Sequence, residues 1–419
     1  MRPWGVKAWQ RGVTVQRSKR TMRDLRTSNR ARVLRRLYFD GQFSRHELAG
    51  ATGLSQASVS NVVGELVEDQ VVVEAGLVGS DGGRPRVLLR VNPDNACVVG
   101  VDVGETHVLV EVFDLTLRRL AMSTFQMESI ANRGEAVVER VLTGLAQCIE
   151  DSGVDPSRLL GVGVGVPGLV ERGSELLVHA QTVGWNGVPL ERMLRAGTDL
   201  PLFIDNGANT LGQAEMWFGA GRGARNAVIA LVGSGVGASV IADGVPYRGA
   251  SGGAGEWGHT TLALDGRPCR CGANGCLEAY IGAKGVLTRY RELAGLPGDV
   301  VDEEVALREL LAEDSSAARE VLNETARYAG AGIGNLINLF NPERVILGGW
   351  AGLLLGSQLL PAIREVAAKH ALHHPYQQAK IKLCELGTES VAMGAATLPV
   401  AEFLGAGGVR SPALMRPTG

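Results

Sequence analysis

One histidine and three cysteines lie close together past the middle of the chain. They are His259, Cys269, Cys271 and Cys276, and they fall within eighteen residues of one another. Three thiolates and one imidazole form a ligand set that a tetrahedral Zn²⁺ prefers. The glycines at 272 and 275 allow a short loop to fold back, so that the four side chains can converge. We therefore predict one structural zinc site per chain, which constrains the fold of this segment.

Two acidic residues bracket this loop. Glu256 stands three residues before His259, and Glu278 stands two residues after Cys276. An acid that is not needed as a metal ligand is a candidate for binding polar hydroxyl groups. A plainer interpretation is a zinc knuckle whose acids are only solvated. A disulfide is a further alternative, although a Cys-x-Cys pair cannot easily close one.

The spacing of these residues is Glu-x-x-His, nine residues, Cys-x-Cys, four residues, and Cys-x-Glu. This pattern resembles the signature of the ROK family, which is named for its repressors, open reading frames and sugar kinases. The resemblance extends from about residue 97 to about residue 400. It implies an α/β two-lobed actin-like ATPase (ribonuclease H-like) fold with sugar in the cleft between the lobes. It also implies that His259 both ligates zinc and touches the sugar, while Glu256 and Glu278 bind sugar hydroxyls.

Alternating apolar runs and glycine turns after residue 95 are typical of an α/β fold. A hairpin is expected over 98–103 and 107–114, with further strands over 159–166, 202–204 and 227–232. Residues 391–404 are expected to form the last helix, packing back on the first lobe. Pro167-Gly168 ends one of these strands, and Gly168 joins the predicted sugar site.

The N-terminal part of the chain is strongly basic. Residues 1–40 contain twelve Lys or Arg and two acids, whereas the whole chain has a formal net charge of −2. A basic arm on an acidic body favours a phosphate-bearing partner. Alternatively, residues 1–20 are a solvated tail or an over-long start, with Met22 as the true initiator.

Residues 29–91 predict three helices followed by a β-hairpin. Ser44 and Glu47 form a capping box that opens the second helix, Gly53 permits a tight turn, and Ser55 caps the third helix. The third helix places apolar residues on one face and small polar residues on the other. Polar residues near the start of such a helix reach base edges in a major groove. The candidate base-reading residues are Gln56, Ala57, Ser58, Ser60 and Asn61.

The hairpin carries Gly83-Arg84-Pro85 in its turn. A guanidinium beside a stiff proline suits insertion into a narrow minor groove, so Arg84 is a further DNA-binding candidate. The segment resembles the winged helix-turn-helix (wHTH) of ROK repressors, which ROK kinases lack. A three-helix module that binds protein is the alternative.

The positions that a ROK kinase uses for catalysis are altered. The kinases carry Asn-Asp-Ala-Asn at a strand end, and here Gly207 takes the place of the catalytic acid, after Asp205 and Asn206. A glycine cannot accept a proton. Glu105 places a negative charge in the first phosphate loop, where a polyanion needs bare backbone N–H groups. Asn206 remains as a sugar-binding amide, and we expect no catalytic residue and no kinase activity.

Taken together, these features predict a DNA-binding transcriptional regulator of carbohydrate metabolism genes, a repressor whose kinase-derived domain senses a small sugar. The alternative is an ATP-dependent sugar kinase with an added DNA-binding domain. The expected partners are double-stranded operator DNA and a small sugar effector, with no membrane. The chain is expected to form a homodimer or a homotetramer. The expected location is cytoplasmic, at the nucleoid when operator is bound.

The sequence also predicts how the chain divides into domains. A basic arm (1–22) precedes a wHTH domain (23–92), and a sugar-sensing domain (95–405) is followed by a flexible tail (406–419). Within the sugar-sensing domain, the first lobe is expected over 95–210 plus 388–405 and the second lobe over 211–387.

Overall fold

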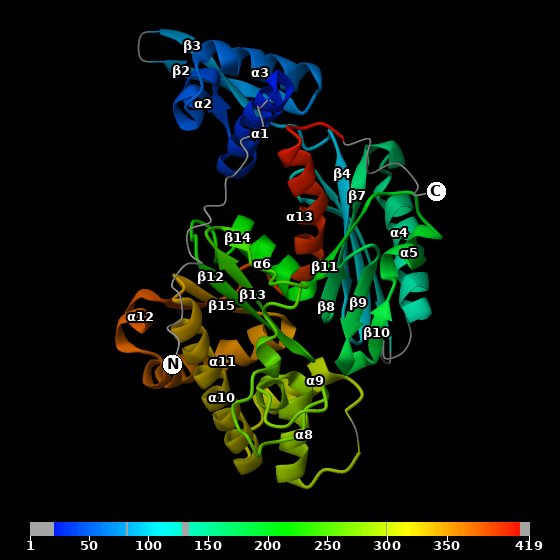
Figure 1. The fold of residues 1–419 in the computed structure, drawn as a ribbon, viewed down its shortest axis with the longest axis vertical. Coiled ribbons are helices and arrows are strands. Elements are labelled where there is room, and N and C mark those ends of the chain that lie inside the picture. The colour runs from blue at the N-terminus through cyan, green and yellow to red at the C-terminus, as the bar shows by residue number, and fades with distance from the viewer. Residues whose placement is uncertain (1–20, 81–82, 128–133, 299, 411–419) are drawn as a thin grey trace, which may run out of the picture. The chain divides into compact units, whose positions relative to one another are not determined.

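A computed structural model describes residues 21–80, 83–127, 134–298 and 300–410 (Figure 1). Side chains are not described for residues 22, 23, 79, 80, 83 and 84. The predicted arm falls mostly on residues 1–20, and the tail mostly on 411–419, both outside the described residues. The chain forms two compact units. Unit 1 contains the residues up to Val91 together with Leu404–Val409, and unit 2 contains Asn92–Phe403 with the residues from Arg410.

The described residues of unit 1 form three helices and a small antiparallel sheet, which are the elements that the sequence predicts for residues 29–91. The sheet order is β1-β3-β2. The elements are α1 (Met22–Asp40), β1 (Phe43–Ser44), α2 (Arg45–Thr52), α3 (Gln56–Glu68), β2 (Val72–Ser80) and β3 (Gly83–Val91). The capping box is confirmed, because Ser44 N–H donates to Glu47 at 2.8 Å while the Ser44 hydroxyl accepts from Glu47 N–H. Gly53 is left-handed, with φ of +69°.

Two bounds in unit 1 differ from the sequence-based expectation. Helix α1 begins at Met22, capped by Thr21, well before the apolar period starts. Strand β3 begins at Gly83, so Gly83-Arg84-Pro85 opens a strand. The hairpin is longer than its apolar runs because backbone pairing continues through polar residues.

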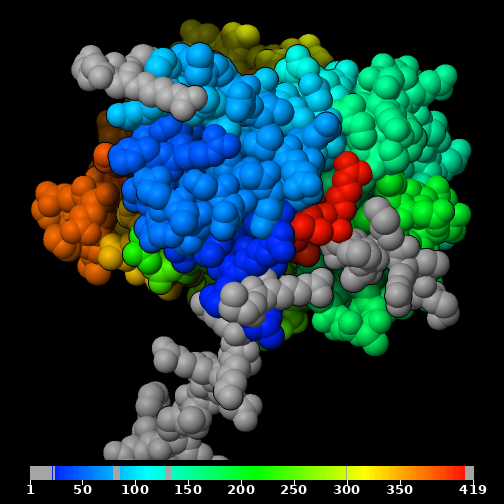
Figure 2. Space-filling view, turned by 90° about the horizontal axis from the view of Figure 1, so that it is seen from above, coloured from blue at the N-terminus to red at the C-terminus, as the bar shows by residue number. Residues whose placement is uncertain are grey.

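The segment Leu404–Val409 packs against α1, although residues from 406 onward were expected to be a flexible tail. Arg30 of α1 is only 7% exposed and donates from Nε to the Gly407 carbonyl at 2.8 Å. Gly407 has φ of +71°, and a Cβ there would lie 2.8 Å from Arg30 Cβ. Figure 2 shows this red segment against the dark blue of α1. The start of the expected tail is therefore part of the packed structure.

The first lobe of unit 2 contains a five-stranded sheet of order β11-β7-β4-β5-β6. Strands β4 and β5 form an antiparallel hairpin, and β7 and β11 add in parallel to β4. The strands are β4 (Cys97–Val103), β5 (His107–Asp114), β6 (Arg119–Gln126), β7 (Leu159–Val166) and β11 (Leu202–Asn206). A second sheet, of order β10-β9-β8, contains β8 (Leu169–Arg172), β9 (Leu176–Ala180) and β10 (Trp185–Val188).

Helices cover both faces of the five-stranded sheet of the first lobe (Figure 1). Helix α4 (Gly134–Ser152) packs on β5 and β6, beside α5 (Leu190–Arg195). Helix α13 (Ser390–Gly405) lies on the other face, so close that a Cβ on Gly163 would sit 1.8 Å from the Ala395 carbonyl oxygen. Glycine is therefore needed on this face of the sheet, and the expected packing of the last helix on the first lobe is confirmed.

The second lobe repeats the strand pattern of the first. Its sheet has the order β14-β13-β12-β15-β16, in which β12 and β13 are antiparallel while β15 and β16 add in parallel. The strands are β12 (Ala227–Val232), β13 (Val236–Ala242), β14 (Val245–Pro246), β15 (Arg344–Gly348) and β16 (Lys380–Leu383). The repeated pattern is that of the two-lobed actin-like ATPase fold, which confirms the predicted fold class.

Helices also flank the second sheet. Helix α6 (Gly207–Phe218) packs on β12 and β13 through an apolar cluster that includes Leu211 and Ile229. A larger core joins the same sheet to the remaining helices, among them α10 (Ser316–Phe340) and α11 (Trp350–His370). The other helices of this lobe are α7 (Glu278–Ile281), α8 (Ala283–Ala294), α9 (Glu303–Ala312) and α12 (His373–Gln378). Among the described residues, no helix is both long enough and apolar enough to cross a bilayer.

Candidate functional site: a His-Cys₃ loop at the junction of two lobes

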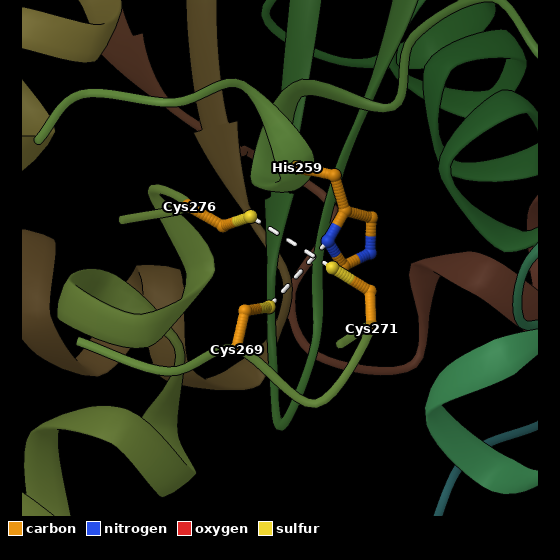
Figure 3. A group of neighbouring side chains, drawn as sticks. All are labelled: His259, Cys269, Cys271 and Cys276. Atoms are coloured by element: carbon orange, nitrogen blue, oxygen red, sulfur yellow. Dashed lines mark hydrogen bonds between the residues drawn. The ribbon is translucent and has the colours of Figure 1, made fainter. Parts of the chain in front are cut away.

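The four predicted metal ligands converge on one point (Figure 3). His259 ends a short 3₁₀ helix (Trp257–His259), Cys269 and Cys271 lie in the following loop, and Cys276 stands just before α7. Their ligand atoms all lie within 4.8 Å of one another. The loop folds back as expected at Gly275, where φ is +73° and a Cβ would sit 1.5 Å from the Ala263 carbonyl oxygen.

The spacing of these atoms fits a four-coordinate metal ion. Cys271 Sγ lies 3.8 Å from Cys276 Sγ, and Cys269 Sγ lies 3.6 Å from His259 Nδ1. A tetrahedron with metal–sulfur bonds of about 2.3 Å has sulfur–sulfur edges of about 3.8 Å. A disulfide needs about 2.05 Å, and all six cysteines of the chain are free. The cluster can therefore hold a metal ion, and its donor set and size are compatible with zinc.

Burial of the thiols opposes their ionisation when no cation is bound. Burial raises the pKa of the Cys269 thiol, and burial also raises the pKa of Cys276. A metal ion binds thiolates, so its charge would offset this desolvation and release the protons.

The two acids that bracket the loop lie at the same site. Glu278 is 5% exposed, and its Oε2 accepts from Val236 N–H at 3.0 Å. Glu256 is exposed, but atoms packed around its carboxyl group raise its pKa by desolvation, with a further upward contribution from the charge of Glu278. His259 opposes both effects on Glu256. Two carboxylates and one imidazole thus face a common region, which suits the binding of several hydroxyl groups.

On the first lobe, Asn206 and Gly168 are in direct contact. Asn206 Nδ2 donates to the Gly168 carbonyl at 2.5 Å, and Asn206 Oδ1 accepts from Ala208 N–H at 2.7 Å. The amide therefore caps α6 and ties it to the turn after β7. One amide hydrogen of Asn206 remains for a further acceptor.

The loop that leads to Glu256 reaches across to the first lobe. A Cβ on Gly252 would lie 2.4 Å from the Val170 carbonyl oxygen of β8. Arg248, earlier in the same loop, donates two hydrogen bonds to Asp205. These contacts join the loop before Glu256 to β8, which follows Gly168, and to Asp205, which precedes Asn206.

Two arginines at this junction were missed from the sequence. Arg248 pairs with Asp205, and Arg270 pairs with Glu105 and Glu278. Arg270 stands between two of the predicted cysteine ligands, so its position in the metal loop could have been predicted from the sequence. Its partner in the first lobe was not, because 165 residues separate Arg270 from Glu105.

The polar candidates on α3 lie on its outer face. Gln56, Ala57, Ser60 and Asn61 are exposed and Ser58 is half-buried, whereas Val59, Val62, Val63 and Leu66 are buried. The predicted division of α3 into two faces is confirmed. Gln56 Nε2 lies 3.0 Å from His46 Nδ1, so α2 helps to position it. The side chain of Arg84 lies outside the described residues.

Comparison with known proteins places the chain in a family. Residues 98–402 match the model of the ROK family. The chain belongs to the ROK family. It is 31% identical to the xylose repressor of Caldicellulosiruptor bescii over 389 residues, which cover 91% of this chain and 97% of that repressor.

A relative of another kind matches less of the chain. A glucokinase of Halalkalibacterium halodurans is 32% identical over 308 residues, covering 71% of this chain and 92% of the kinase.

A solved structure is similar over almost the whole chain. The crystal structure of a ROK family transcriptional regulator, a homologue of the E. coli MLC protein, covers 92% of this chain and 98% of its own, with a TM-score of 0.75 and 24% identity. This structural similarity supports the fold. The family membership expected from the sequence is confirmed by the match to the family model.

Proposed function

We propose that this ROK protein is a sequence-specific DNA-binding transcriptional repressor of carbohydrate genes, whose affinity for operator DNA is set by a small sugar. The observation that carries the proposal is the presence of unit 1, with its exposed polar face on α3, on the same chain as a ROK body. A relative named xylose repressor matches over nearly the full length. The glucokinase relative matches over a smaller part of the chain.

The contacts at the kinase base position support a sensor without kinase activity. Gly207 has no side chain to accept a proton, and the nearby Asp205 already accepts hydrogen bonds from Arg248 and Asn209. A general base must be within hydrogen-bond reach of the hydroxyl that it deprotonates, and it must be free to take the proton. The Asp205 carboxylate is already engaged by a guanidinium and an amide, so it is not free to take this proton.

In this proposal His259, Cys269, Cys271 and Cys276 hold one structural Zn²⁺. All four positions of the tetrahedron come from the protein, so the ion serves to hold the loop in shape. The loop in turn positions His259 beside Glu256 and Glu278. These three residues, with Asn206 and Gly168 from the first lobe, form the proposed sugar site.

The sugar would act by preferring one arrangement of the protein over another. A ligand shifts such an equilibrium only by its differential affinity, typically worth about 1–3 kcal/mol of coupling. Two copies of unit 1 would read two half-sites spaced about 34 Å or a multiple of it, so we propose a homodimer or homotetramer. Gln56, Ala57, Ser58, Ser60 and Asn61 would contact base edges, and Arg84 the minor groove.

Selection of bound duplexes from a random DNA pool, at one fixed salt concentration, tests the proposal. We expect a pseudo-palindromic sequence to emerge, and its affinity to change at least about fivefold with one sugar of a panel led by xylose, glucose and N-acetylglucosamine. A coupled ATP assay with the same sugars should show no turnover above background. Robust phosphorylation with no sequence preference would establish the kinase alternative instead.

A further inference from the structure

The carboxylate of Glu105 lies between two glycine turns from different lobes. Glu105 itself stands in the turn between β4 and β5 of the first lobe, next to Gly104. The second turn, Gly233–Gly235, joins β12 to β13 in the second lobe. A Cβ on Gly235 would sit 3.0 Å from Glu105 Oε1, so the acid reaches the backbone of the opposite turn.

Arg270 binds the carboxylate of Glu105 in a bidentate arrangement. Its Nη1 donates to Glu105 Oε2 at 2.5 Å, and its Nη2 donates to Glu105 Oε1 at 3.1 Å. The same Nη2 donates to the Ser234 carbonyl and to Glu278 Oε1, both at 3.2 Å. The exposed fractions of the side chains are 22% for Arg270, 17% for Glu105 and 6% for Glu278. A mostly buried charge of this kind needs a partner of opposite sign.

The surroundings of Glu105 are those of a site for a small anion. A planar guanidinium binds a carboxylate or a phosphate with the same paired geometry. Glycine turns leave backbone close to such a group, because no Cβ intervenes. The described contacts therefore amount to an anion site that already contains an anion, supplied by the chain itself.

We propose that Arg270 and the two glycine turns form an anion-binding site that Glu105 fills from within the chain, and that the filled site holds Glu278 in position. Phosphates and carboxylates are the chemical class that this site accepts. In the native protein, Glu105 prevents phosphates and carboxylates in the solvent from binding at this site. Arg270 is a positioning residue, because it reaches the sugar through Glu278.

The same contacts tie the two lobes together. Glu105 belongs to the first lobe, whereas Arg270 and Glu278 belong to the second. Arg248 and Asp205 form another pair between the lobes with the same polarity, arginine from the second and acid from the first. A change at Glu105 therefore reaches both the junction of the lobes and the sugar site. This consequence for sugar binding rests on the proposed function, whereas the anion site does not.

Titration of pyrophosphate into the zinc-loaded full chain tests the anion site directly. Glu105→Gly removes the internal anion and frees Arg270 Nη1, while Arg270 Nη2 keeps its contacts with Glu278 and Ser234. We therefore expect pyrophosphate to bind at least about tenfold more tightly than to the wild type. Glu105→Gln is the matched control, because it removes the charge but still fills the space, and it should gain no affinity. The double variant Glu105→Gly, Arg270→Gln should lose the gain. Equal affinity in Glu105→Gly and wild type, or a gain that survives Arg270→Gln, overturns the proposal.

A second measurement covers the case in which Glu105→Gly folds poorly. In Glu105→Ala, with the best sugar of the panel, we expect sugar affinity to fall about five- to twentyfold, since Glu278 loses part of its support. Millimolar pyrophosphate or acetate should restore at least half of that loss on a logarithmic scale, and it should not affect Glu105→Gln. A loss of affinity that no anion restores counts against the proposal. Neither titration uses DNA, so failure of operator recognition would leave both results standing.

Discussion

Asp205 Oδ2 accepts two hydrogen bonds from Arg248, at 2.6 Å from Nη2 and 3.1 Å from Nε. The acid is 3% exposed and lies at the end of β11, while Arg248 comes from a loop of the other lobe. The acid nearest to the kinase base position therefore has an interlobe structural partner. In the proposed sensor, this pair keeps the carboxylate of Asp205 from acting as a general base.

Restoring the kinase acid alone should not restore a kinase. We expect Gly207→Asp to show turnover near background, because Glu105 and Arg270 still occupy the space beside the second glycine turn. Removing a general base alone lowers the rate of the chemical step by about 10²- to 10⁴-fold. If the nucleotide site were complete, Gly207→Asp would therefore raise the turnover rate by a similar factor. A coupled ATP assay on wild type and Gly207→Asp, with Glu278→Ala as the sugar-binding control, measures this. A gain above about 10²-fold would mean that ATP still binds productively.

Loss of one thiolate should remove the metal and the sugar response together. We expect about one zinc per chain by elemental analysis of the wild type, and less than about a tenth of that in Cys271→Ser or Cys276→Ser, since a structural site couples metal binding to local folding. Cys97→Ala removes a buried thiol of β4, which is not among the four predicted ligands, and should keep the metal. Metal-free protein with an intact sugar response would refute the prediction.

Substitutions in unit 1 should affect DNA and not sugar. Asn61 is exposed on α3, so Asn61→Ala should reduce base preference at one operator position by about 1–3 kcal/mol with little change in the salt dependence. Arg84→Ala should weaken operator binding by about the same amount if it reads a narrow groove. Gln378→Ala, an exposed amide of the second lobe, is the control. Operator affinity that is unchanged in both unit 1 variants would favour the protein-binding alternative.

Glu111 should make stability depend on pH near neutrality. The residue is 1% exposed, and burial raises the pKa of its carboxyl to about 7 against the opposing effect of Arg119, while Glu389 and Asp102 raise it further. The folded state therefore binds the proton more tightly than the unfolded state, whose pKa is near 4.5. The resulting stabilisation is complete below about pH 4.5 and is lost as the pH rises through about 7.

Glu111→Gln should abolish this contribution. Between pH 5 and pH 8 we expect the melting temperature of the wild type to fall relative to that of the variant, by an amount equivalent to at most about 3 kcal/mol. Thermal melting of both proteins across this range measures the difference. Parallel profiles for the two proteins would show that Glu111 stays ionised throughout.

Much of the fold and half of the site could be predicted from local sequence patterns. The strands 159–166 and 227–232 were predicted with the bounds that the structure shows, because continuous apolar runs between glycines identify buried strands. The apolar face of α3 followed from its period. The four metal ligands fall within one short loop, so their convergence also depends on local chain geometry.

Other features depended on contacts between distant residues. The first half of α1 has no apolar period, and its place is set by Arg30, which binds Glu65, Asp69 and Gly407. The packing of residues 406–409 has no local signal either, since it depends on positive-φ glycines meeting a helix almost 400 residues earlier in the chain.

The sequence alone determined which chemistry is present: three thiols and an imidazole that suit a metal, two acids beside them, and a glycine at the position where the family resemblance predicts a catalytic acid. The tertiary structure alone decided how the remaining charges pair. Arg248 and Asp205 are 43 residues apart in the chain, and Arg270 and Glu105 are 165 apart, and they meet only when the two lobes fold against each other. Partly buried charges must find partners, but a linear pattern does not say which partners, because that choice is made by the packing of the two sheets and their loops.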